Sequence, residues 1–354
     1  MKPDILSLSL NEIRDLIAEL GEPKFRADQL YRWLHVSKAT SFDEMTNLPT
    51  KLKEALKERF IVDPIRLITY QESAIDGTRK YLFALPDGNL IESVRMIYHH
   101  GISVCISTQV GCRMGCVFCA STLDGLERNL TVGEMLGQVY AIIRQTKERV
   151  SNLVLMGCGE PMDNYDNVVA FVRRISDADG ENISQRNITV STCGLVPKIR
   201  QLKDENLQIT LAISLHAADD EKRKALMPIA RVYSLDELLT AVREYYDENK
   251  RRITFEYSLV RGENDSPEYA ERLGRLLNRY FDHAHVNLIP VNPIRERNFS
   301  STEASSVYAF QKKLEKFQIN ATIRREMGRD IDGACGQLRR RYSEQKPSSD
   351  PVGE

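Results

Sequence analysis

The sequence lacks a long hydrophobic run, and it lacks an excess of charge of either sign. No stretch of about eighteen apolar residues occurs, and the first residues have no apolar segment behind a basic start. These absences argue against a membrane span and against a secretory signal peptide, so we expect a cytoplasmic protein with no membrane partner. The net charge of −1 does not mark the chain as a nucleic-acid-binding protein, and evidence for such a function must come from local features.

The cysteines do not form an even set. The chain has 7 of them, and an odd number in a reducing compartment favours metal-binding or catalytic roles over a disulfide scaffold. No repeat of fixed period and no low-complexity tract interrupts the sequence.

The order of the sequence patterns predicts three structured parts. Apolar residues at helical spacing over 10–20, 25–34 and 51–60 predict a helical accessory domain at residues 1–62. Alternating patterns separated by Asp-Gly pairs predict an antiparallel β extension at 63–100. Residues 101–342 are predicted to form a third domain, and the polar stretch 343–354 is predicted to be a disordered tail.

Within the third part, strand patterns alternate with helical patterns. The expected strands are 104–110, 152–157, 186–192, 208–216, 252–260 and 285–291, with a last strand at 321–326. Six βα units predict an α/β fold with a parallel sheet, closed into a partial (βα)6 barrel. In such folds the chemistry lies beyond the carboxyl ends of the strands.

A cluster of three cysteines follows the first of these strands. Cys112, Cys116 and Cys119 are spaced C-x3-C-x2-C, which suits an iron–sulfur cluster with three protein ligands. One iron then stays open for S-adenosylmethionine (SAM). A zinc site, which needs four ligands, a ferredoxin-type cluster, which needs a fourth cysteine, and buried structural cysteines are the alternatives.

Polar and glycine-rich motifs follow the other strands. They are Gly157 to Pro161, Ser191 to Gly194, Ser214 to His216, and Asn292 with Pro293. Each alone is an ordinary turn signal, but together they place candidate ligands at successive strand ends. A carboxylate at Glu160 suits the ammonium group of SAM.

With these motifs the chain resembles the RlmN/Cfr family of radical SAM rRNA methyltransferases, and it is most similar to the RlmN side of that family. The resemblance extends from the helical N-terminal part to about Tyr342. It is carried by the Cys105–Cys119 segment, by Leu90–Val94, Gly159–Pro161 and Ile213–His216, and above all by Asp330–Leu338, which contains Cys335.

The resemblance implies a role for each site residue. Cys112, Cys116 and Cys119 would ligate a [4Fe-4S] cluster. SAM would be bound by a second set, namely Gly159, Glu160, Ser191, Ser214, Leu215, His216 and Asn292. Cys335 would carry a methyl group, Cys105 would resolve the protein–RNA intermediate through a transient disulfide, and Glu92 would act as the base. Judged without the resemblance, Cys105 reads as a buried structural cysteine and Glu92 as a solvent-facing carboxylate.

The resemblance further implies methylation of C2 of an adenine in 23S rRNA, of the adenine 2503 type, with tRNA adenine 37 as an open second substrate. Two SAM molecules would be used through a methyl-cysteine intermediate. A low-potential donor such as flavodoxin or ferredoxin would supply electrons, and the chain is expected to be a monomer. The alternatives are C8 methylation of the same adenine, a radical SAM enzyme acting on a small molecule, and a non-catalytic iron–sulfur protein that binds RNA.

Several arginines are candidates for RNA contact. Arg295, Arg297, Arg324, Arg325, Arg329 and Arg339 to Arg341 follow or flank the last motifs. They would suit phosphate groups, although a solvated charged face is an equally good interpretation.

Overall fold

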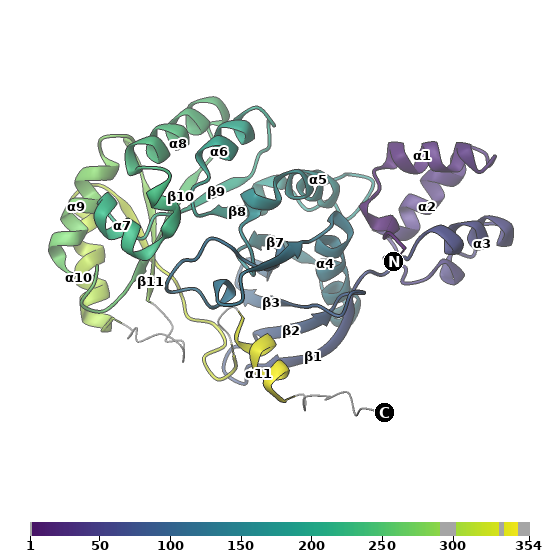
Figure 1. Cartoon of the computed structure of the whole chain (residues 1–354), viewed down its shortest axis with the longest axis horizontal. Helices are drawn as coiled ribbons and strands as arrows, with labels where there is room; N and C mark the ends of the chain where they lie inside the picture. The colour runs from purple at the N-terminus through teal and green to yellow at the C-terminus, as the bar shows by residue number, and fades with distance from the viewer. Residues whose placement is uncertain (1, 291–301, 333–335, 346–354) are drawn as a thin grey trace, which may run out of the picture.

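The N-terminal residues form a small helical unit at one end of the molecule. The computed structural model describes residues 2–290, 302–332 and 336–345. The unit contains α1 (Leu10–Glu19), α2 (Phe25–His35) and α3 (Thr50–Arg59), and it lies to one side of the sheet, at the far end from α9 and α10 (Figure 1). A capping box starts α1, in which Ser9 accepts the amide of Glu12 and the Glu12 carboxylate accepts the amide of Ser9.

Buried polar contacts fix this unit to the rest of the chain. The Tyr31 hydroxyl donates to Asp177 over 2.6 Å, and a ring nitrogen of His35 lies 2.9 Å from the Tyr140 hydroxyl. The buried Arg174 guanidinium donates to the main-chain oxygen of Leu8. Because these groups are withdrawn from water, separating the unit would leave several of them without partners.

A ten-stranded sheet forms the centre of the described part of the protein. Its order is β1-β2-β3-β4-β7-β8-β9-β10-β11-β12, so β1 and β12 are its two edges and the sheet is open. The strands are β1 (Arg66–Glu72), β2 (Arg79–Ala84), β3 (Leu90–Tyr98), β4 (Gly101–Cys105), β7 (Val150–Leu155), β8 (Ile188–Thr192), β9 (Thr210–Ser214), β10 (Ile253–Leu259), β11 (His285–Pro290) and β12 (Asn320–Ile323). The first four pair antiparallel, and from β4 onward each strand in this order pairs parallel with the next.

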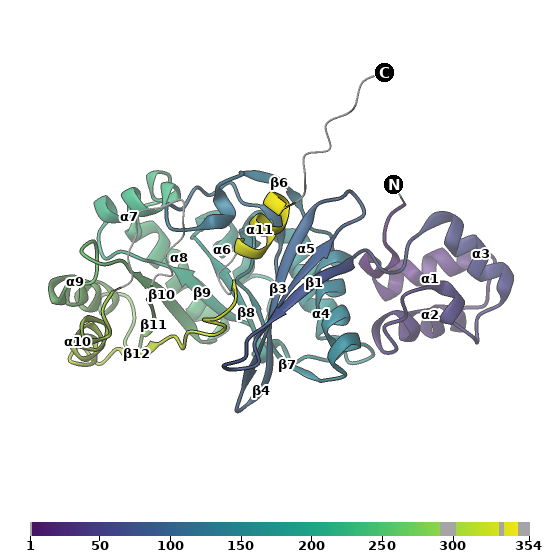
Figure 2. The same ribbon diagram turned by 90° about the horizontal axis from the view of Figure 1, so that it is seen from below.

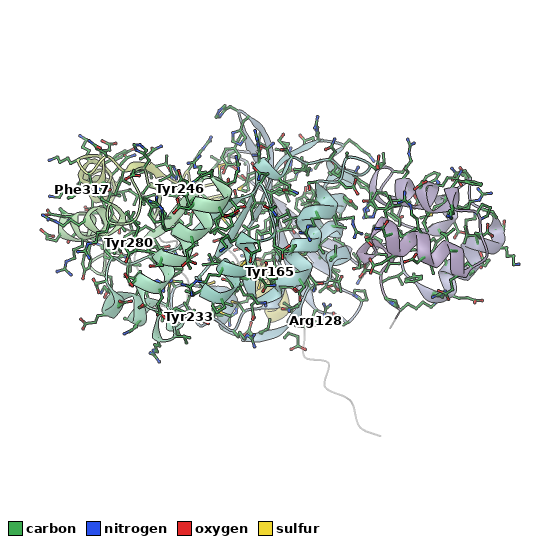
Figure 3. The ribbon with its side chains drawn as sticks, turned by 90° about the horizontal axis from the view of Figure 1, so that it is seen from above. Arg128, Tyr165, Tyr233, Tyr246, Tyr280 and Phe317 are labelled. Carbon is green, nitrogen blue, oxygen red and sulfur yellow. The ribbon has the colours of Figure 1, made fainter. Side chains whose placement is uncertain are left out.

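Helices cover one face of the parallel strands. They are α4 (Val132–Thr146), α5 (Tyr165–Ile175), α6 (Val196–Lys203), α7 (Asp220–Leu226), α8 (Leu235–Asn249), α9 (Pro267–Leu277) and α10 (Ala304–Glu315). Figure 3 looks onto this layer, with Tyr165 of α5 and Tyr246 of α8 in the foreground. Alternate strand residues, such as Leu153, Leu211 and Phe255, belong to the buried core. The predicted α/β fold with a parallel sheet is confirmed. None of the helices in the described residues is long and apolar enough to span a bilayer.

The strand expected at 104–110 is two strands. The strand β4 ends at Cys105, and β5 (Gln109–Gly111) pairs with β6 (Leu126–Asn129) in a separate hairpin. The break has a local cause: the amide of Ser107 donates to the Gln138 side chain over 2.9 Å, and that of Thr108 donates to the carbonyl of Cys158. These donors are therefore lost to the strand ladder.

A last helix was not expected from the sequence. The helix α11 (Gln337–Gln345) extends three residues beyond the start predicted for the tail, and residues 346–354 lie outside the described part. Once a helix has begun, each further residue adds a hydrogen bond at little cost. α11 contacts β2 and β3, and Figure 2 shows it beside the antiparallel strands.

Candidate active site

The three clustered cysteines line one cavity at the carboxyl ends of the parallel strands. Cys112, Cys116 and Cys119 lie on the loop after β5, and all three border a cavity of about 290 Å³. The loop is tied down where the amide of Val117 donates to the carbonyl of Leu226 over 3.0 Å. Gly115 takes a φ of 70°, a conformation that suits glycine. The local sequence thus turns three thiols toward one space.

Burial and nearby negative charge make Cys112 and Cys116 poor anions on their own. Burial, together with the neighbouring Cys119, raises the pKa of Cys112 to about 12. Burial and the other two thiols raise the pKa of Cys116 even more. Thiolates are the ligand form, so a positively charged iron group would offset this repulsion. In the described residues no group of three histidine, cysteine or acidic side chains could hold a single metal ion. A multi-iron cluster spreads its ligands more widely than one ion, so the donor set fits a cluster better.

The Gly157–Pro161 loop forms the next wall of the cavity. A Cβ at Gly157 would lie 2.6 Å from the carbonyl oxygen of Ile106, and one at Gly159 would lie 2.6 Å from the Cβ of Gln109. Both positions therefore require glycine so that the loop can approach the segment from Ile106 to Gln109. Glu160 is buried, and its carboxylate accepts the amide of Cys193 over 2.7 Å and that of Met162 over 3.0 Å. Burial raises the pKa of this carboxyl.

Serine and histidine side chains complete the cavity from the next strands. Ser191 and Ser214 both line it, with their hydroxyls 3.5 Å apart. His216 is buried, and burial lowers its pKa to about 3, so the ring is neutral. Its Nδ1 accepts the amide of Ser258 over 2.9 Å, and Phe118 packs edge-on against the ring. A neutral ring held in this way can donate through its other nitrogen.

Two of the predicted SAM contacts are not found on this wall. Leu215 is fully buried in the hydrophobic core and does not border the cavity, because its side chain points to the opposite face from those of Ser214 and His216. Asn292 lies outside the described residues.

Glu92 and Cys105 lie on the same face of the sheet as the cavity. Cys105 is paired with Val94 on one side and with Val154 on the other, and Val94 is two residues from Glu92 on β3. Cys105 is buried and free, and burial raises its pKa, while Arg324 and Lys80 oppose the rise. The six described cysteines are all free thiols, so none of them forms a disulfide. Glu92 is buried rather than solvent-facing.

Cys335 lies outside the described residues, and the described residues that flank segment 333–335 are bonded to β2 and β3. The Lys80 ammonium lies 3.1 Å from the Glu92 carboxylate and donates to the main-chain oxygen of Asp332 over 2.7 Å. The amide of Gly336 donates to Glu92 over 2.6 Å, and that of Arg339 does so over the same distance. The two ends of segment 333–335 therefore meet at the Lys80–Glu92 pair, close to Cys105.

Lys80, Glu256 and Asn287 were not expected from the sequence to be site residues. Lys80 has 0% exposure, and Glu256 borders the cavity, where it accepts the Asn287 amide over 2.8 Å. A signal was present: the parallel strands alternate polar with apolar residues, as in Thr254-Phe255-Glu256-Tyr257-Ser258. A strand covered by core on both faces would be apolar throughout. The alternation thus indicates a polar, unpacked inner face.

Comparisons with known proteins agree with this geometry. The family model described as Radical SAM superfamily matches residues 106–273, and the Ribosomal RNA large subunit methyltransferase N-terminal domain matches residues 3–62. A probable dual-specificity RNA methyltransferase RlmN of Lachnospira eligens is 58% identical over 98% of this chain and 99% of its own length. Its counterpart in Lachnoclostridium phytofermentans is 55% identical over 97% of this chain and 96% of its own. A radical SAM methyltransferase from Sphaerobacter thermophilus has the same fold, with a TM-score of 0.90, 42% identity, and coverage of 95% of this chain and 98% of the other.

Proposed function

The chain belongs to the RlmN family of radical SAM RNA methyltransferases, and from this premise we propose that it methylates C2 of an adenine in 23S rRNA, of the adenine 2503 type. The relatives are named as probable dual-specificity RNA methyltransferases. We therefore extend the proposal to a second substrate, adenine 37 of tRNA. The observation that carries the proposal is the convergence of three cysteines and the polar strand ends on one cavity, with Asp332 and Gly336, which flank residues 333–335, bonded to Lys80 and Glu92 on the same face.

Cys112, Cys116 and Cys119 would hold a [4Fe-4S] cluster, and the remaining polar wall would bind SAM. Together, the bound cluster and SAM supply a 5′-deoxyadenosyl radical after reduction by a donor such as flavodoxin or ferredoxin. Gly159 brings the main chain close to the ligand, and Ser191, Ser214 and the neutral His216 offer hydrogen bonds to it. Asn292 is proposed to complete this set. Glu160 fixes the wall by joining the loops after β7 and β8, and its carboxylate would face the ammonium of SAM.

Three residues on the other side are proposed to handle the methyl group and the proton. The Cys335 thiol would carry the methyl group that is transferred to the base. Glu92 would accept the ring proton, for which its position between Lys80 and the Cys335 segment is suitable. Cys105 would then attack the Cys335 sulfur, which breaks the bond between that sulfur and the transferred carbon and releases the RNA product. The transient disulfide left between the two cysteines would be reduced back to two thiols by a cytoplasmic reductant. Burial raises the pKa of Cys105, and the cationic groups of Arg324 and Lys80 offset part of that rise in favour of the thiolate needed for this attack.

Product analysis tests the proposal. The purified protein, with its cluster reconstituted, is incubated with SAM, a reductant and an unmodified transcript of 23S rRNA, and the digested nucleosides are identified by mass spectrometry. We expect 2-methyladenosine. The appearance of 8-methyladenosine would overturn the C2 assignment, and release of 5′-deoxyadenosine with no methylated nucleoside would overturn RNA as the substrate.

A further inference from the structure

The inner face of the sheet carries polar side chains at both ends of its parallel strands. At the carboxyl ends of the strands it forms the SAM cavity described above, and toward their amino ends it forms a second cavity of about 440 Å³. The second cavity is lined by alternate strand residues such as Asn152, Thr189 and Thr254. Met156, Glu256 and Arg324 border both cavities, so the two are halves of one trough that crosses the sheet.

The amino-end mouth of this trough is strongly basic. Arg186 and Arg252 lie just before β8 and β10 at this mouth, Arg324 and Arg325 follow β12 and line the same cavity, and all four are exposed. Across the described part of the chain, none of these four guanidinium groups has an ion pair or a side-chain hydrogen bond. The one acid in the lining, Glu256, is buried and already bonded to Asn287. On a protein of net charge −1, four unpaired arginines around one opening form a local anion-binding surface.

We propose that the RNA reaches SAM through this amino-end mouth, with Arg186, Arg252, Arg324 and Arg325 contacting its phosphates and the target adenine inserted along the trough. This inference rests on the proposed function, and it adds the route by which the RNA enters and the end of the strands at which it enters. The carboxyl-end mouth is lined by the cysteine loop and the SAM-binding wall, so that side belongs to the cofactors.

Aromatic side chains at the same mouth suit an unstacked nucleotide. Tyr98 and His100 line the second cavity and stack with ring centroids 5.1 Å apart. Single-stranded RNA is commonly held by arginines on its phosphates together with aromatic rings on its bases. A base on such a surface has left its own stack, as an enzyme acting on a ring carbon requires.

The route ends where the chemistry is proposed. Cys105 shares the inner face with Val154 and is hydrogen-bonded to the main chain of Met156, which borders both cavities. Arg324 interacts with Cys105 and Glu256 through its charge. A base that enters from the amino end therefore moves along the trough toward the SAM cavity, with Cys105 and Glu92 on one flank of its path.

The double variant R186A/R252A tests the route, because both arginines lie at the outer end of the trough. We expect the KM for the 23S rRNA transcript to rise on the order of tenfold. The slope of log affinity against log salt should fall by about one for each phosphate group that the variant no longer binds. SAM affinity and the melting temperature report whether the variant is folded.

The matched control is R200A/R275A, which removes the same charge from α6 and α9 on the helix-covered side. Arg200 and Arg275 are already paired with Glu244 and Glu271. This variant is expected to keep the wild-type KM and salt slope. Equal KM values for the two double variants would overturn the route while wild-type methylation still stands. If the wild-type protein methylates no RNA, the proposed function itself fails.

Discussion

Lys80 carries its charge inside the protein, where charges need close partners. Its side chain is fully buried, and it lies 3.1 Å from a Glu92 carboxylate that is 7% exposed. Removing one member of a buried pair leaves the other uncompensated, at a cost of about 3–5 kcal/mol. Glu92 keeps two main-chain donors, so the K80M variant should lose about 3 kcal/mol of unfolding free energy in urea.

Two further variants distinguish the loss of the buried ion pair from the loss of a lysine side chain as such. K80M/E92Q should recover part of the loss, because no buried charge remains. K57M removes an exposed lysine paired with Asp43 and Glu54 and should leave stability unchanged. A K80M protein as stable as the wild type would show that the ion pair does not hold this region together.

His35 predicts a pH-dependent contribution to stability. Burial lowers its pKa from 6.5 to about 3, with Arg174 and Lys38 adding to the effect. Below about pH 6.5 the His35 ring is protonated in the unfolded chain but stays neutral in the folded chain. The free energy of unfolding therefore falls as the pH drops below about 6.5. From pH 7 to pH 5 the wild type should lose about 2 kcal/mol more than the H35Q variant, measured by urea unfolding. Parallel pH profiles for the two proteins would contradict this assignment.

At the scale of elements, α11 depends on a carboxylate from the distant strand β3. Glu92 accepts the amides of Gly336 and Arg339, which lie at the start of the helix, where amides have no partners within it. The variant E92Q keeps the shape but removes the charge. We expect amide hydrogen exchange in residues 337–345 to speed up more than it does elsewhere, where the loss of the charge paired with the buried Lys80 lowers stability in general. The E127Q variant, at an exposed position on β6, is the control; equal exchange in both variants would rule out this anchoring role.

The elements show what the sequence could and could not predict. The strands and helices of the parallel sheet were predictable because their periodic patterns are local. The break after Cys105 was not, because it depends on Gln138, a side chain 31 residues further along the chain that takes the Ser107 amide. The helix α11 was missed for the same reason, since its anchor lies 244 residues away in sequence.

At the scale of the whole molecule, the candidate site is assembled from distant segments. The three cysteines and most strand-end residues could be predicted, since strands that run in parallel bring their carboxyl ends together. Lys80 and the trough could not be predicted from motifs, because they depend on which face each strand turns inward. That information was present in the polar alternation of β10, but only the assembled sheet shows that the polar positions of several strands form one channel.

The central proposal concerns the segment whose flanking residues, Asp332 and Gly336, are bonded to Lys80 and Glu92: we propose that the thiol of Cys335 carries the methyl group. The most direct measurement is mass spectrometry of the Cys335 peptide after the reconstituted protein is incubated with SAM and no RNA. We expect an S-methyl group on Cys335 of the wild-type protein. We expect none in the C112A/C116A/C119A protein, because the cluster site positions SAM. An unmodified Cys335 in a protein that still methylates RNA would contradict the proposal.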